Sequence, residues 1–115
     1  MDMYKIRIHL LHEDEDWDLN TFIEIELPFV PRKDEYVEIS EEDQKALSKA
    51  IKESENVYGY GKYIHGFKGS MEKLEDMINE NRDAALENLM ISHLGIVENV
   101  WYVSGEEYIR ILLDF

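Results

Sequence analysis

The residues best suited to contact a ligand or partner lie in one segment, residues 57–69, which combines glycine, aromatic and lysine side chains. Aromatic side chains and lysines dock into protein surfaces, and glycines allow tight bends. The segment therefore predicts a long Gly/Tyr-rich binding loop. Its expected contact residues are Tyr58, Tyr60, Lys62, Tyr63 and Lys68. The alternative is a connector whose tyrosines fold back onto a sheet.

Trp17 is a second candidate contact residue, because it lies within an acidic run that extends from Glu13 to Asp18. Clustered carboxylates can bind hard cations such as calcium. The run lacks the central glycine and the late glutamate of an EF-hand loop, so we interpret it as a solvated acidic loop. Trp17 then either anchors this loop in the core or projects as a recognition residue.

The histidines do not form a catalytic or metal-binding pattern. His9 and His12 lie three positions apart in an expected strand, which directs them to opposite faces. His65 and His93 are distant in sequence, and the chain has no cysteine for a thiolate zinc site. We therefore expect no metal, no cofactor and no enzymatic activity.

The composition indicates one domain over residues 1–115, with 44% hydrophobic residues and a net charge of -14. This charge opposes approach to phosphate backbones, so general nucleic-acid binding is not expected. No apolar run reaches the roughly 18 residues of a membrane span. A chain without cysteine suits a reducing compartment, so a cytoplasmic location is expected. Segment 44–73 has a net positive charge, unlike the segments on either side of it. It either attracts these acidic segments within the molecule or forms a local binding patch.

Hydrophobic periodicity predicts five strands and two helices. The expected strands cover residues 4–10, 22–27, 36–39, 96–103 and 108–113. Ser40 and Ser70 are expected helix caps, and they predict one helix from 41 to about 53 and another from 71 to about 90. Short turns between consecutive strands favour antiparallel pairing. The prediction is an α+β fold: a small antiparallel sheet or partly open β-barrel with two helices inserted between the third and fourth strands.

The run from Leu27 to Val37 contains Pro31-Arg32, an acidic Glu35 and Val37. It resembles the Pro-Arg-x-Gly-Glu-x-Val turn of small uncharacterised proteins that are frequent in Bacteroides-type bacteria. Residues 97–102 and 109–112 resemble the strand and final hairpin that follow in those proteins. The resemblance implies a partly open β-barrel interrupted by residues 41–95, and it implies no activity. Asp34 stands where that pattern usually has glycine.

The leading functional hypothesis is a non-enzymatic, acidic protein–protein interaction module with an unidentified protein partner. In this hypothesis the aromatic loop controls dissociation and the acidic run controls association. One alternative is a nucleic-acid-mimicking inhibitor of a DNA-binding protein. Another is a small-molecule binder that uses the mouth of the curved sheet. The sequence leaves both a monomer and a homodimer open.

Overall fold

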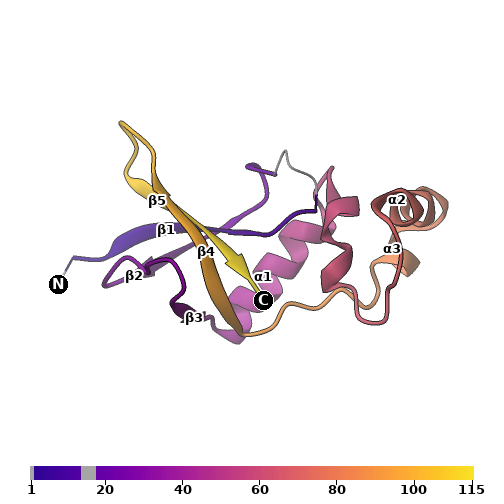
Figure 1. Cartoon of the computed structure of the whole chain (residues 1–115), viewed down its shortest axis with the longest axis horizontal. Coiled ribbons are helices and arrows are strands. Elements are labelled where there is room, and N and C mark those ends of the chain that lie inside the picture. The colour runs from indigo at the N-terminus through magenta and orange to yellow at the C-terminus, as the bar shows by residue number, and fades with distance from the viewer. Residues whose placement is uncertain (1, 14–17) are drawn as a thin grey trace.

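The computed structural model describes residues 2–13 and 18–115. In this part of the chain, five strands and several helices form an α+β fold (Figure 1), as predicted. The elements in chain order are β1 (Tyr4–Leu10), β2 (Ile23–Leu27), β3 (Tyr36–Glu38), α1 (Glu41–Lys52), the 3-10 helix η1 (Val57–Tyr63), α2 (Met71–Glu80), α3 (Arg82–Ala85), β4 (Leu94–Tyr102) and β5 (Tyr108–Asp114).

The strands form one mixed sheet in the order β2-β1-β5-β4-β3, which curves into a half-barrel. The hairpin pairs β1–β2 and β4–β5 are antiparallel, as predicted, and β3 also pairs antiparallel with β4. Strands β1 and β5 run parallel, so the expectation of a wholly antiparallel sheet is wrong. The long helical connection allows the second hairpin to dock beside β1, and parallel neighbours require such a connection.

The two faces of the sheet differ because side chains alternate along each strand. Ile6 and Ile8 of β1 are fully buried on the inner face, whereas Arg7 between them lies on the outer face. Ile111 and Leu113 of β5 are fully buried as well. Helix α1 and η1 complete the same hydrophobic cluster, with the large buried side chains Leu47, Ile51, Tyr60 and Tyr63.

Helices α1 and α2 begin where their capping residues predict. The Ser40 hydroxyl accepts a hydrogen bond from the N–H of Asp43 at 3.1 Å. The Ser70 hydroxyl accepts one from the N–H of Lys73 at 3.1 Å. Each cap satisfies a backbone donor that has no partner within its helix, so these local features determine both helix starts.

The predicted helix from residue 71 to about 90 is wrong in its second half. Helix α2 ends at Glu80, because Asn81 adopts an extended conformation with φ -157° and ψ 97°. The Asn81 side chain accepts a hydrogen bond from the N–H of Ala84 at 3.2 Å and so caps the short helix α3. Asparagine competes for backbone hydrogen bonds, which favours a cap over a helix interior.

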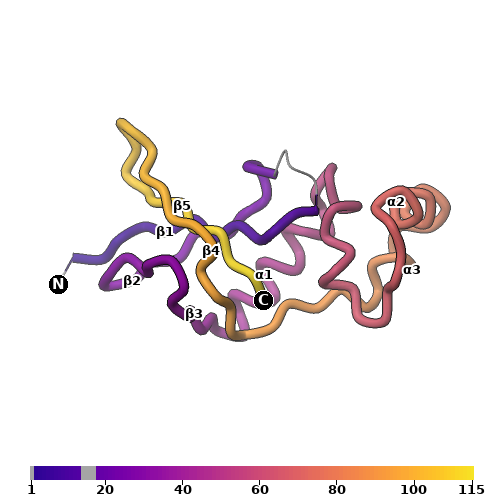
Figure 2. Tube along the Cα trace, viewed as in Figure 1, coloured from indigo at the N-terminus to yellow at the C-terminus, as the bar shows by residue number. Residues whose placement is uncertain are grey.

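The molecule is elongated, with extents of 48, 28 and 22 Å. Helices α2 and α3 lie at one end, and the β4–β5 turn lies toward the other (Figure 1). Strands β2 and β3 are the two edges of the sheet, so the connection between them, residues 28–35, runs from one edge of the half-barrel to the other. Figure 2 shows this connection at the end of the molecule that lies opposite α2. We call this end the half-barrel mouth.

Candidate functional site

The first part of the predicted binding loop, residues 57–64, is largely built into the core, whereas most of residues 65–69 are exposed. Its first seven residues form η1, and Tyr60 and Tyr63 are only 1% and 5% exposed. Burial raises the pKa of both phenols, and the nearby carboxylates of Asp18 and Asp114 raise it further. Tyr60 and Tyr63 therefore do not form a contact surface in this structure, and the alternative of a folded-back connector describes them.

Gly59 explains how η1 packs so closely against the end of β1. A Cβ atom at this position would lie 1.9 Å from a ring atom of His12, so only glycine admits the imidazole. The His12 Nε2 lies 2.7 Å from the carbonyl oxygen of Asn56, and its ring meets the Tyr60 ring edge-on at 4.8 Å between centroids. The glycine that suggested a flexible loop instead serves close packing.

The other predicted contact residues do not share one environment. Tyr58 is half-buried, and Lys62 forms an ion pair with Asp114. Lys68 is exposed. Trp17 lies outside the described residues, as do residues 14–16 of the acidic run. Lys68 thus remains the one exposed member of the predicted set, within the described chain, that forms no ion pair there.

The strongly exposed aromatic side chains of the described chain gather instead at the half-barrel mouth. They are Tyr4, Phe29, Tyr36 and Tyr102, with exposed fractions of 48% to 69%. Tyr4, Phe29 and Tyr102 line one open groove of about 610 Å³, which we call the mouth groove. Phe29 also lines a smaller adjoining groove of about 170 Å³ together with Tyr36. Four exposed aromatic side chains therefore belong to one continuous surface.

Strand register brings Tyr4 and Tyr102 to the same end of the sheet. Tyr4 begins β1, Tyr102 pairs with Ile109 near the start of β5, and β5 is parallel to β1. Tyr4 lies two residues before the buried Ile6, so the two side chains belong to the same face of the sheet. Tyr102 lies two residues after the half-buried Val100 and shares its face in the same way. The alternation along the strands therefore places both tyrosines on the core-facing side of the sheet, but they lie where the core ends.

The connection between β2 and β3 forms the other wall of the mouth groove. Pro28 and Pro31 cannot donate a ladder hydrogen bond, so the chain leaves the sheet and carries Phe29 with it. Asp34 has a φ of +72°, in the left-handed region that favours glycine, which the resembling pattern has at this position. The N–H of Asp34 then donates to the carbonyl of Val97 at 2.8 Å, which returns the chain to the sheet.

The charged side chains that line the mouth groove in the described structure are Arg32 and Lys33. Neither forms an ion pair with a described carboxylate, although the backbone N–H of Arg32 donates to the Glu35 side chain at 2.6 Å. No histidine or carboxylate is among the described lining residues, so the groove offers aromatic surface and two cations but no acid–base pair.

Comparison of the chain with protein-family models, curated proteins and solved structures gave no match. Among the residues that the structure describes, no group of three or more His, Asp or Glu side chains is arranged to hold a metal ion. None of the described helices has the length and apolar character needed to cross a membrane. The surface chemistry of the fold therefore carries the functional interpretation.

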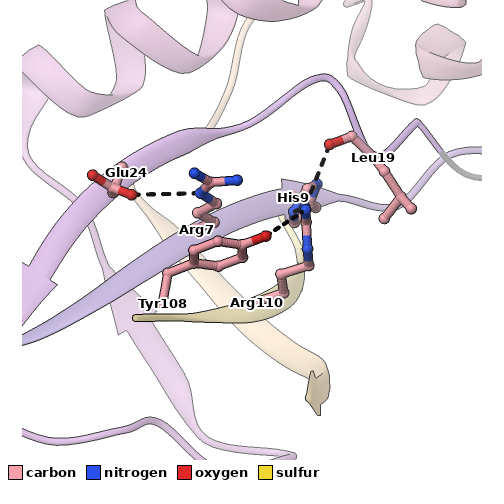
Figure 3. A network of polar contacts seen from close by, with 6 residues as sticks. All are labelled: Arg7, His9, Leu19, Glu24, Tyr108 and Arg110. Atoms are coloured by element: carbon pink, nitrogen blue, oxygen red, sulfur yellow. Dashed lines mark hydrogen bonds and ion pairs between the residues drawn. The ribbon is translucent and has the colours of Figure 1, made fainter. Parts of the chain in front are cut away.

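A network of polar side chains lies on the outer face of β2, β1 and β5 (Figure 3). Arg110 of β5 stands beside Arg7 of β1 in the strand register. Its Nη1 lies 2.8 Å from His9 Nε2, and its Nη2 donates to the Tyr108 hydroxyl at 3.2 Å. Arg7 Nε contacts a carboxylate oxygen of Glu24 at 3.4 Å. The network joins three neighbouring strands, β2, β1 and β5.

His9 is a neutral member of this network. It is 1% exposed, and burial lowers its pKa from 6.5 to about 4, with the adjacent Arg110 charge acting in the same direction. A neutral imidazole can accept a hydrogen bond at Nε2 from the permanently charged Arg110. The arrangement makes His9 a buried support for Arg110 and not a solvent-accessible base.

Sequence reasoning missed the mouth groove. One local signal was present, because Phe29 is a large apolar residue held between two prolines in a turn. Tyr4 and Tyr102 carry no such signal, since each continues the core-facing alternation of its strand. Only the register of distant strands shows that they emerge at the same end.

Proposed function

We propose that this protein is a non-enzymatic interaction module that docks a protein partner at the mouth groove. The observation that carries the proposal is the clustering of Tyr4, Phe29 and Tyr102, all strongly exposed, around one groove. Aromatic residues dominate the binding energy of protein interfaces, and contiguous exposed apolar surface is unusual without a role. The lack of an acid–base pair among the described lining residues supports a binding function over a catalytic one.

The surrounding charge supports a division of roles within such an interface. A net charge of -14 acts at long range and sets the association rate and its salt dependence. Arg32 and Lys33 are cations within this acidic background, so they favour a partner segment that brings carboxylates to the groove. The aromatic side chains lose water on docking and control dissociation.

A cytoplasmic location belongs to the same proposal, because a chain without cysteine suits a reducing compartment.

A small-molecule ligand in the mouth groove is the second candidate. Its volume of about 610 Å³ lies in the range of ligand pockets, and aromatic side chains line it. Small-molecule sites usually enclose most of their ligand, whereas this groove is open to solvent. The open shape therefore favours a peptide segment of a protein partner. Nucleic-acid mimicry has less support, because the charged lining residues are cations.

Site-specific photo-crosslinking tests the proposal. A photoreactive phenylalanine analogue replaces Phe29 in one protein, and in the control it replaces Met90, an exposed side chain that does not line the mouth groove. In extracts of the native host, the Phe29 position should capture one protein that the Met90 position does not. A small-molecule function predicts no protein adduct, and a low-mass ligand that copurifies with the wild type but not with Tyr102→Ala.

Affinity measurements with the captured partner complete the test. Phe29→Ala and Tyr102→Ala should each raise the Kd by about tenfold or more, mainly through faster dissociation, because each removes a central aromatic contact. Met90→Ala should change the Kd less than about twofold. If both mouth variants bind like the wild type while remaining folded, the mouth groove is not the docking site.

A further inference from the structure

The outer face of the sheet places two arginines side by side in an acidic chain. Arg7 and Arg110 are direct neighbours on the parallel strands β1 and β5 and lie on the same face. Like charges at adjacent strand positions repel each other. The described carboxylate within reach is Glu24, at 3.4 Å from Arg7, and Arg110 forms no ion pair with any described carboxylate. Among the described carboxylates, only Glu24 pairs with these two arginines, so one of the two positive charges has no described counter-ion.

Two aromatic rings hold both guanidinium groups in place. The Arg7 Cζ lies 3.6 Å from the Tyr108 ring centroid and 4.5 Å from that of Phe22. The Arg110 Cζ lies 5.1 Å and 5.9 Å from the same two centroids. Stacking on rings and hydrogen bonds to fixed partners orient the planar forks before any ligand arrives. A ligand that binds them loses little of its affinity to side-chain ordering.

The network leaves hydrogen-bond donors for a ligand. Arg110 uses Nη1 toward His9 and the carbonyl of Leu19, and it uses Nη2 toward Tyr108. Arg7 uses Nε toward Glu24, and its two terminal nitrogens have no hydrogen-bond partner among the described residues. The Tyr108 hydroxyl accepts a bond from Arg110, so its own proton can serve another acceptor. The Arg7 side chain is 26% exposed, which leaves it accessible.

From this arrangement we infer that Arg7 and Arg110, assisted by the Tyr108 hydroxyl, bind an oxyanion, namely the carboxylate or phosphate group of a ligand. Guanidinium forks match the paired oxygens of both groups. His9 does not compete with the ligand as a cation, because it is buried behind Arg110 and neutral. The site lies on the sheet face opposite the core and does not depend on the mouth groove.

The test uses inorganic phosphate and acetate as probes, with sodium chloride added to keep the ionic strength constant. NMR follows the Nε–Hε signals of Arg7 and Arg110 during each titration. A saturable shift is expected, with a Kd on the order of 1 mM. Tighter binding of phosphate identifies a phosphate-bearing ligand, and acetate binding of equal or greater strength identifies a carboxylate. A shift that grows linearly without saturation for both probes overturns the inference.

Three variants separate a site from diffuse attraction. Arg7→Gln should raise the Kd for the better probe about tenfold, because it removes a charged donor group. Glu24→Gln should lower the Kd about two- to fivefold, since it removes a competing carboxylate while leaving both arginines. Lys49→Gln removes an exposed cation on α1, away from both proposed sites, and should have no effect. If Lys49→Gln weakens binding as much as Arg7→Gln, or if Glu24→Gln changes nothing, the two arginines only stabilise the packing of the Phe22 and Tyr108 rings.

Discussion

The burial of His9 predicts that the protein loses stability in mild acid. Burial and the adjacent Arg110 guanidinium lower the pKa of His9 from 6.5 to about 4 in the folded protein. In the unfolded chain the imidazole is solvated and has a pKa of about 6.5. Between these two values the unfolded state binds a proton that the folded state does not bind, so lowering the pH favours unfolding.

The magnitude follows from the two pKa values. They differ by about 2.5 pH units, and each unit corresponds to about 1.4 kcal/mol, so His9 alone should remove about 3 kcal/mol of unfolding free energy. The stabilisation is complete above pH 6.5, declines as the pH falls toward about 4, and changes no further once both states are protonated. Domains usually have about 5 to 15 kcal/mol in total, so this loss is large.

Urea unfolding of the wild type and of His9→Gln across this pH range measures the effect. Glutamine offers Arg110 an acceptor but does not titrate, and the carboxylates titrate in both proteins. The unfolding free energy of the wild type minus that of the variant should therefore fall by about 3 kcal/mol between pH 6.5 and about 4. His93→Gln controls for the loss of an exposed histidine. Parallel pH profiles of the wild type and His9→Gln would refute the reasoning from burial.

Four further substitutions at three positions test the fold by denaturant unfolding. Tyr63→Phe should raise the unfolding free energy by about 1 kcal/mol, because the buried hydroxyl has no hydrogen-bond partner among the described residues; a loss of stability would contradict this. Asp34→Gly should leave the unfolding free energy unchanged or raise it by up to about 1 kcal/mol, since glycine tolerates the positive φ. Asp34→Val should lower the unfolding free energy by about 2 kcal/mol. Equal effects of the two substitutions would show that this backbone conformation is unimportant. Ile109→Asp should cost several kcal/mol and unfold much of the protein, because it places a charge in the buried face beside Ile6; an unchanged midpoint would mean that this hairpin is peripheral.

Local patterns in the sequence determined most of the secondary structure. Apolar alternation along β1 and β5 marks their inner faces, and Ser40 and Ser70 mark the helix starts, because alternation and capping act over a few residues. Asn81 was a local signal as well, and its tendency to cap a new helix outweighed the apolar stripe that continues beyond it. These features can be read without knowledge of the neighbouring strands.

Tertiary structure alone decided which elements meet. The alternation of apolar residues predicts which side chains share a face, but it does not predict that β5 lies beside β1. Strand order depends instead on how the two hairpins together bury the most apolar surface. The same competition for burial drew Tyr60 and Tyr63 into the core, although their glycine-rich surroundings suggested a surface loop. It also left Tyr4 and Tyr102 strongly exposed at the mouth, where the buried core of the described structure ends.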